Sequence, residues 1–290
     1  MFPNLIRTAR PLFLFNVILL YVLGIGIARY DGAILDFDLV LLGQLWLLAL
    51  QLGVSFLHAY FNDHSGSESQ EDSESVVPIS RSIRLLIACF CLAAIASLSV
   101  LLIRVVKDPG VFLLMVLIVF GALSYSLPPI RLEYSGYGEL VLSMLVANLI
   151  PAMGYQLQGG DSLRLLAVVT FPLTALHLAM LLVFSLSTYA SDMKHTHRTL
   201  MLRMGWQNGM LLHNLAVLCA YLILVLAITF GLPWKIGAPA LFTLPIGVLQ
   251  IWNINRIAAG AKPQWKQLTT LAAGLFCITA YLLTFSFWIR

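Results

Sequence analysis

Charged residues are scarce in this 290-residue chain and make up only 10% of it, whereas soluble domains typically carry about 25%. Hydrophobic residues account for 60% of the sequence, and its mean hydropathy is +0.91. This composition excludes an ordinary soluble domain and favours an integral membrane protein. We therefore read the net charge of +4 as a membrane-topology signal and expect no nucleic-acid partner.

Cysteine is also rare, and its four copies lie inside long apolar stretches, at Cys89, Cys91, Cys219 and Cys277. Cys89 and Cys91 are two positions apart, so they do not share a helix face. The spacing matches no metal-binding or redox motif. We interpret all four as small packing residues.

Long polar connections are missing too, because apolar stretches follow one another along the chain. A membrane-spanning helix needs about 20 mainly apolar residues, and nine stretches qualify: 11–30, 38–61, 83–105, 110–127, 138–158, 165–189, 209–231, 234–252 and 267–288. They are too long and too uniformly apolar for barrel strands. The sequence predicts an all-α integral membrane protein, with about nine transmembrane helices in one bundle and a single domain over residues 1–290.

The distribution of Lys and Arg predicts the orientation. If the N-terminus is cytoplasmic, eleven of the seventeen fall in cytoplasmic segments and six on the other side, as the positive-inside rule requires. The first span follows two arginines and could pass for a signal sequence, but eight further spans favour an uncleaved helix. We expect the cytoplasmic membrane of a bacterium, with loops 62–82, 128–137, 190–208 and 253–266 on its cytoplasmic side.

The first of these loops gathers acids. Five of the thirteen carboxylates lie between residues 61 and 74, at Asp63, Glu68, Glu71, Asp72 and Glu74. A membrane protein that places its few acids at one face is expected to hold a cation there, or a ligand that a cation binds.

The third loop adds bases beside one acid. Asp192 ends the sixth span, and Lys194, Arg198 and Arg203 follow it. The acid could bind Mg²⁺ while the bases take phosphate oxygens. The alternative is a solvated loop that only obeys the positive-inside rule.

The second loop opens with paired prolines, Pro128 and Pro129, which end a helix and place Arg131 just outside the membrane. Tyr125 would lie one turn inside, where its ring could stabilise a carbocation or serve as an interfacial anchor. His58 and Asn62 share a helix face and are the best candidates for a cavity wall.

These motifs resemble the UbiA superfamily of intramembrane prenyltransferases over nearly the whole chain. The matching segments are Ala9-Arg10-Pro11, Tyr125-Ser126-Leu127-Pro128-Pro129-Ile130-Arg131-Leu132, Gly136-Tyr137-Gly138-Glu139-Leu140, and Asp192 with Arg198-Thr199-Leu200 and Arg203-Met204-Gly205. The likeness is closest to the branch that prenylates 1,4-dihydroxy-2-naphthoate in menaquinone synthesis.

The resemblance implies an Mg²⁺-dependent transfer of an isoprenyl group from a prenyl diphosphate to a hydrophobic or aromatic, quinone-precursor-like acceptor within membrane lipid. It assigns catalytic roles to Asp63, Tyr125 and Asp192. It assigns diphosphate binding to Asn62, Arg131, Lys194 and Arg198, and the metal to Asn62, Asp63 and Asp192, with Glu68 or Asp72 as substitutes. The residues carry no signal for oligomeric state.

The acidic motifs also depart from the family pattern. Gly66, Gln70 and Thr188 stand where the family has acids, and Val77 stands where it usually has Arg. Either the metal site is rebuilt from nearby acids or catalysis is altered. Two alternatives therefore stay open: a membrane terpene cyclase or non-quinone prenyltransferase, and a homologue that binds prenyl diphosphate without turnover.

Overall fold

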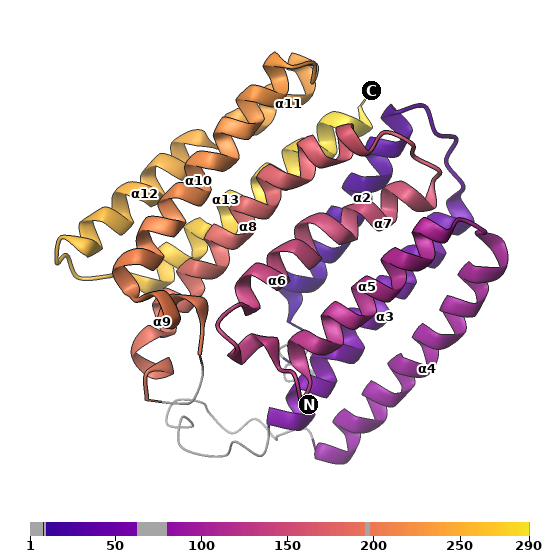
Figure 1. Cartoon of the computed structure of the whole chain (residues 1–290), viewed down its shortest axis with the longest axis horizontal. Coiled ribbons are helices and arrows are strands. Elements are labelled where there is room, and N and C mark those ends of the chain that lie inside the picture. Colours follow the sequence, from indigo (N-terminus) through magenta and orange to yellow (C-terminus); the bar gives the residue numbers. More distant parts are fainter. Residues whose placement is uncertain (1–7, 9, 63–79, 195–197, 290) are drawn as a thin grey trace.

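The computed structural model describes residues 8, 10–62, 80–194 and 198–289, which form a bundle of long helices lying side by side (Figure 1). Within these residues nine spans are long and apolar enough to cross a membrane, as predicted. They are α2 (Pro11–Tyr30), α3 (Phe37–Asn62), α4 (Arg81–Val105), α5 (Pro109–Ser126), α6 with η2 and α7 (Gly138–Met144, Leu145–Leu149, Ile150–Leu157), α8 (Leu163–Asp192), α10 (Trp206–Thr229), α11 with α12 (Trp234–Leu241, Leu244–Ala258) and α13 (Trp265–Trp288).

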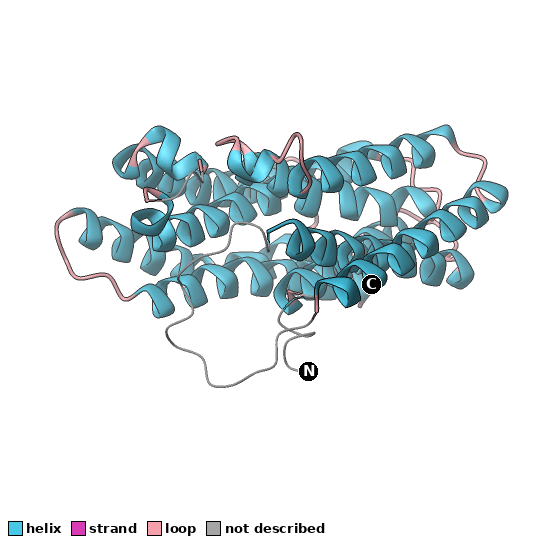
Figure 2. Ribbon diagram, turned by 90° about the horizontal axis from the view of Figure 1, so that it is seen from below, coloured by secondary structure: helices cyan, strands magenta, loops and turns pink. Residues whose placement is uncertain are grey.

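Two short helices complete the described structure at one end of the bundle. They are the 3₁₀ turn η1 (Leu132–Tyr134), which follows α5, and α9 (Leu200–Met204), which follows α8. Figure 2 shows helices joined by loops, with no strand among the described residues. Both short helices lie within loops that the sequence predicted to be functional, 128–137 and 190–208.

Local sequence explains where several spans begin. Ser80, Asp108 and Ser162 precede α4, α5 and α8, and the side chain of each accepts a hydrogen bond from a backbone N–H in the first turn. Such caps satisfy N–H groups that have no partner within the helix. Short polar residues therefore fix where these three spans begin.

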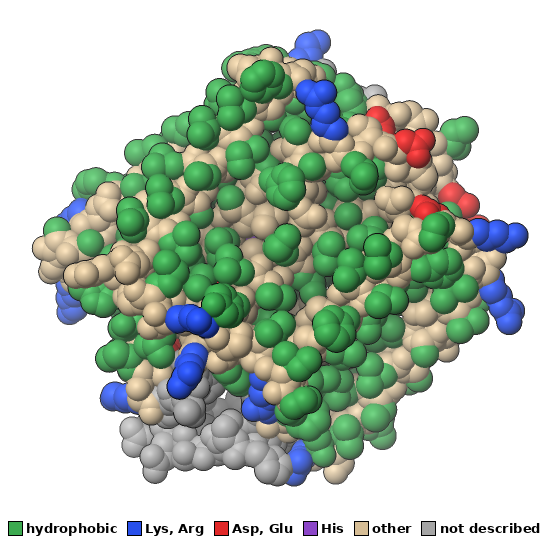
Figure 3. Space-filling view, viewed as in Figure 1, with side chains coloured by type: hydrophobic (Ala, Val, Ile, Leu, Met, Phe, Trp, Pro, Cys, Tyr) green, Lys and Arg blue, Asp and Glu red, His purple; other side chains and the backbone are tan. Residues whose placement is uncertain are grey.

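Many large apolar side chains lie on the outside of the bundle. Leu86 and Phe90 on α4 and Phe120 on α5 are more than 60% exposed, and hydrophobic side chains cover much of the face in Figure 3. Lipid tails are as apolar as leucine, so these side chains gain nothing from burial in protein. The exposed apolar surface is that of an integral membrane protein.

The core includes a close crossing of α2 and α7, which glycines permit. A Cβ on Gly24 would lie 2.0 Å from the carbonyl oxygen of Pro151, and one on Gly154 would lie 2.5 Å from that of Tyr21. Small residues at such contacts let membrane helices approach closely. The glycines therefore allow these two helices to pack closely within the core.

Candidate functional site

A cavity of about 240 Å³ opens where α5, η1 and α8 meet. Tyr125 lies in the last turn of α5, Glu133 in η1, and Asp192 at the end of α8, and all three line this cavity. Leu181 and Phe184 provide apolar wall deeper along α8. The structure thus brings together an aromatic ring and a carboxylate that lie in separate sequence motifs.

The loop after α5 has an unusual backbone. α5 ends before Pro128 and Pro129, whose missing N–H groups prevent the helix from continuing, and the bond between the two prolines is cis. Arg131 then adopts a left-handed conformation with φ 38°, and Arg10, before α2, does so with φ 51°. These two arginines are the non-glycine residues with positive φ in the described structure, and such conformations concentrate at functional sites.

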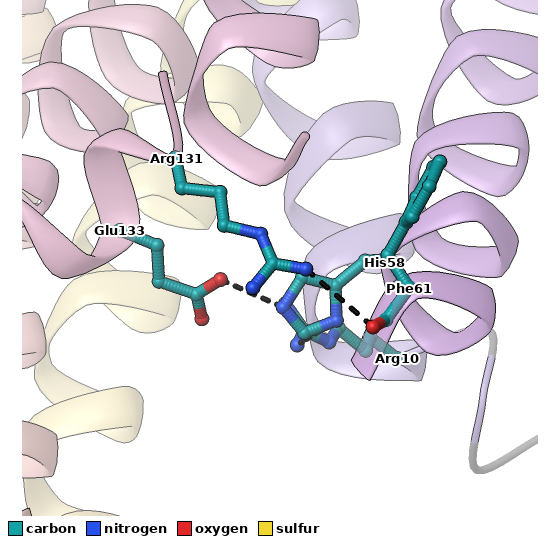
Figure 4. A network of polar contacts seen from close by, with 5 residues as sticks. All are labelled: Arg10, His58, Phe61, Arg131 and Glu133. Atoms are coloured by element: carbon teal, nitrogen blue, oxygen red, sulfur yellow. Dashed lines mark hydrogen bonds and ion pairs between the residues drawn. The ribbon is translucent and has the colours of Figure 1, made fainter. Parts of the chain in front are cut away.

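Arg10, His58 and Glu133 form a polar chain beside this loop (Figure 4). An Arg10 Nη2 lies 3.2 Å from His58 Nδ1, and His58 Nε2 lies 2.7 Å from a Glu133 carboxylate oxygen. Because arginine can only donate, Nδ1 must be the accepting nitrogen. With Nδ1 accepting from Arg10, the Nε2–H group donates to Glu133, so His58 bridges the guanidinium and the carboxylate.

The guanidinium of Arg131 lies next to this chain in Figure 4. Its Nη2 is 3.5 Å from the Phe61 carbonyl oxygen, which is a long contact. Its Nε is buried and has no hydrogen-bond partner among the residues that the structure describes. A buried, unpaired guanidinium N–H is costly unless it binds a ligand, so Arg131 is suited to receive an anion.

The second polar loop starts at Asp192, the last residue of α8, which is partly buried. The Thr188 hydroxyl donates to an Asp192 carboxylate oxygen at 2.8 Å. Thr188 occupies the position where the sequence comparison expected another acid, and it too lines the cavity. The second motif therefore supplies one carboxylate and one hydroxyl. Lys194 follows in an exposed turn.

Glu139, in the first turn of α6, connects the loop after α5 to the loop after α8. Its carboxylate is buried and accepts the Leu200 backbone N–H on both oxygens, at 3.1 and 3.0 Å. The Ser185 hydroxyl also donates to it, at 2.7 Å. An acid at the first turn of a helix satisfies N–H groups and favours the helix dipole. Glu139 thus fixes the start of α9 beside the cavity.

Further contacts link the same loops at their surface. Ser135 and Arg198 form an isolated parallel β-bridge, and the Arg203 guanidinium lies 4.2 Å from the centre of the Tyr137 ring. Arg198 is exposed and lines a separate cavity of about 440 Å³ with Ser135, Leu202 and Arg203. The structure therefore does not bring Arg198 into the cavity of Asp192 and Tyr125.

Four predicted site residues belong to the stretch 61–74. Asp63, Glu68 and Asp72 lie outside the described residues, and Asn62 is the last residue of α3. Across the described part of the chain, no group of three or more His, Cys, Asp or Glu residues could hold a metal ion. The first acidic island and the described cavity must therefore be considered separately.

Sequence reasoning gave Glu133 no role and used Glu139 only as part of a motif. Glu133 follows the predicted Arg131 by two positions, and Glu139 lies in the first turn of α6 after a glycine. The sequence feature that could have identified them as site residues is their position close to Arg131. Nothing local indicates that their partners are 75 and 61 residues away.

Comparison with known proteins decides the family. The profile of the UbiA prenyltransferase family matches residues 17–270. The chain belongs to the UbiA prenyltransferase family. It is accordingly an integral membrane protein of that family, as the sequence motifs predicted. None of the curated proteins matches the sequence significantly.

Solved structures of UbiA proteins share the fold. A UbiA homologue from Archaeoglobus fulgidus bound to GPP and Mg²⁺ has a TM-score of 0.66 and 15% identity, covering 97% of this chain and 99% of its own. An apo UbiA homologue from Aeropyrum pernix K1 has a TM-score of 0.65 and 14% identity, covering 93% and 96%. A digeranylgeranylglyceryl phosphate synthase has a TM-score of 0.68 and 12% identity, covering 99% and 97%.

Proposed function

We propose that this UbiA family member transfers an isoprenyl group from a prenyl diphosphate to an aromatic, quinone-precursor-like acceptor in the membrane, with Mg²⁺ as cofactor. The main support is that Tyr125 and Asp192, from two separate motifs, line one cavity. That cavity is at the end of the bundle where the Lys- and Arg-rich loops lie, so we place the reaction at the cytoplasmic face.

The donor atoms at the cavity suit Mg²⁺, which prefers oxygen and is often held by one or two carboxylates together with substrate phosphates. Asp192 offers a carboxylate there, and Thr188 a hydroxyl. Asp192 would hold the metal with Asn62 and Asp63, and Glu68 or Asp72 would replace the missing acids. When bound, Mg²⁺ neutralises negative charge on the leaving diphosphate.

The diphosphate itself would be bound by cationic side chains around the loop ends. Arg131 is the strongest candidate, because its buried Nε lacks a partner among the described residues. Lys194 lies in the turn directly after Asp192. Arg198 remains a candidate through the neighbouring cavity, which adjoins the same loop at Ser135.

In the proposed reaction the allylic C–O bond of the donor breaks, and diphosphate leaves with the electron pair. A bond then forms between the prenyl carbon and a ring carbon of the acceptor, and the ring loses its proton to a base. Tyr125 lines the cavity, and its ring would stabilise positive charge on the prenyl carbon. Leu181 and Phe184 would exclude water from that carbon.

A second candidate changes the acceptor. The protein with a TM-score of 0.68 is a digeranylgeranylglyceryl phosphate synthase, so the fold is compatible with a reaction that uses a non-quinone acceptor. The altered acidic motifs, in which Gly66, Gln70 and Thr188 replace expected acids, are the observation that favours a cyclase or a homologue that binds without turnover as further alternatives.

The deciding experiment uses purified protein in nanodiscs. Radiolabelled geranyl, farnesyl and geranylgeranyl diphosphates are incubated with and without Mg²⁺, and with 1,4-dihydroxy-2-naphthoate, glycerol phosphates or no acceptor. A Mg²⁺-dependent prenylated naphthoate product is expected. A prenylated glycerol phosphate would favour the second candidate, and a hydrocarbon without acceptor would favour the cyclase. Saturable donor binding without any product would identify the homologue without turnover.

A further inference from the structure

A second polar cavity, of about 250 Å³, lies between the end of α12 and the start of α13. The loop that joins these helices is at the left-hand edge of Figure 1. No residue that lines this cavity also lines the one around Tyr125 and Asp192. Its polar lining is cationic or amide in character and consists of Asn253, Arg256, Lys262, Gln264 and Gln267. All of these side chains can donate hydrogen bonds.

None of the described residues that line this cavity is acidic. Asp192 is the last acid in the sequence, since residues 193–290 contain neither Asp nor Glu. The Arg256 guanidinium lies 4.8 Å from the centre of the Trp252 ring, and Lys262 also lines the cavity. Clustered cations without an acid attract an anion from outside the chain.

The position of the cavity relative to the bilayer indicates which anion. Trp252 and Trp265 flank it, and tryptophan concentrates at the level of lipid headgroups. An adjoining open hollow of about 550 Å³ is lined by Lys266, and by Thr270 and Leu271 further along α13. The two hollows share Gln264 and Gln267. The cationic cavity therefore adjoins an open hollow on the side of a membrane-spanning helix.

We propose that this cavity binds the phosphate group of an anionic membrane lipid. Arg256, Lys262 and Lys266 would neutralise the phosphate, and the amides would donate to its oxygens. An acyl chain would follow the adjoining hollow along α13. In Figure 3 the corresponding edge carries Lys and Arg side chains and no Asp or Glu. The adjoining hollow favours a lipid over free phosphate, which has no apolar part to place there.

The test measures lipid binding by the full-length protein in neutral detergent, using native mass spectrometry. Dihexanoyl phosphatidylglycerol, dihexanoyl phosphatidylcholine and inorganic phosphate serve as separate probes. The test variant carries Arg256→Gln, Lys262→Gln and Lys266→Gln. The control variant carries Arg104→Gln, Lys107→Gln and Lys235→Gln, which remove the same charge at the opposite end of the bundle. Melting temperatures confirm that both variants are folded.

The wild type and the control variant are expected to bind phosphatidylglycerol more tightly than phosphatidylcholine. Each cation near a membrane surface contributes about fivefold in affinity for anionic lipid, so the test variant should bind at least about tenfold more weakly. Equal binding of the two lipids, or equal losses in both variants, would overturn the proposal. Displacement of the lipid by inorganic phosphate at the same concentration would overturn the proposal that the ligand is a lipid and would indicate soluble phosphate instead.

Cross-linking keeps the proposal testable if the triple variant does not fold. Photoactivatable phosphatidylglycerol is cross-linked to the wild-type protein in nanodiscs, and the modified peptides are mapped. Adducts within residues 252–271 are expected. Adducts found only elsewhere on the chain would contradict the site.

Discussion

Glu139 and Leu200, 61 positions apart, are joined by two hydrogen bonds from one backbone N–H group to both oxygens of one buried carboxylate. This contact ties the start of α6 to the start of α9. Thr199, directly before Leu200, lines the cavity together with Asp192 and Tyr125. Glu139 lines the same cavity, and through Leu200 it positions the segment by which the second motif reaches the site.

Removing the Glu139 carboxylate should impair both stability and turnover. Glu139→Ala leaves the Leu200 N–H buried without its acceptor, which costs about 1–3 kcal/mol. We expect a lower melting temperature and a reduced kcat. Glu139→Gln keeps one carbonyl acceptor and should retain more of both. Scanning fluorimetry and a prenyl-transfer assay measure the two effects. An alanine variant with wild-type melting temperature and kcat would show that the contact does not position α9.

Asp192 should be essential for turnover but not for insertion into the membrane. Asp192→Ala removes the carboxylate that the second motif offers to Mg²⁺, and we expect kcat to fall by about 10²–10³, as for loss of other electrostatic contacts to developing charge. Asp38→Ala, at the opposite end of the bundle, is the matched control. Protein yield and melting temperature check folding. A kcat equal to that of the control would refute the metal assignment.

The metal site can also be tested by adding a carboxylate at position 188. Thr188→Asp places a second carboxylate one helical turn from Asp192, on the same face of α8 and at the position where the family pattern has an acid. One further charge near the metal is worth about 1 kcal/mol in water-exposed surroundings. The Mg²⁺ concentration for half-maximal activity should therefore fall about fivefold. Thr188→Val, which removes only the hydroxyl, should not lower it. An unchanged Mg²⁺ requirement in Thr188→Asp would place the metal elsewhere.

Arg131 should act on donor binding. Hydrogen bonds to charged groups contribute about 1.5–3 kcal/mol, so Arg131→Gln should raise the KM for prenyl diphosphate by about 10- to 150-fold. Arg131→Lys keeps the charge but loses the planar fork and should recover only part of the affinity. Arg104→Gln controls for net charge. A KM unaffected in Arg131→Gln would mean that the unpaired Nε serves no anion.

The sequence predicted the spans well because runs of about 20 apolar residues are a strong physical signal. It also predicted that Tyr125 and Asp192 belong to one site, through the family motifs that contain them. The chain from Arg10 through His58 to Glu133 was beyond sequence reasoning, because it joins three segments whose packing depends on the whole bundle. The β-bridge between Ser135 and Arg198, and the neighbouring cavity that Arg198 lines, were beyond sequence reasoning for a similar reason.

The first acidic island can be tested directly, although Glu68 and Asp72 lie outside the described residues. If the metal site is rebuilt, one of these acids replaces those missing at Gly66 and Gln70. Glu68→Ala and Asp72→Ala should then differ in their Mg²⁺ requirement. The variant that lacks the true ligand needs a higher Mg²⁺ concentration for half-maximal activity, and the other variant behaves as wild type. Because Mg²⁺ requires near-ideal octahedral geometry, both acids are not expected to serve equally. Mg²⁺ titrations of prenyl transfer decide between them. Identical titration curves for both variants and the wild type would show that neither acid binds the metal, leaving Asp63 and Asp192 as the candidate acids.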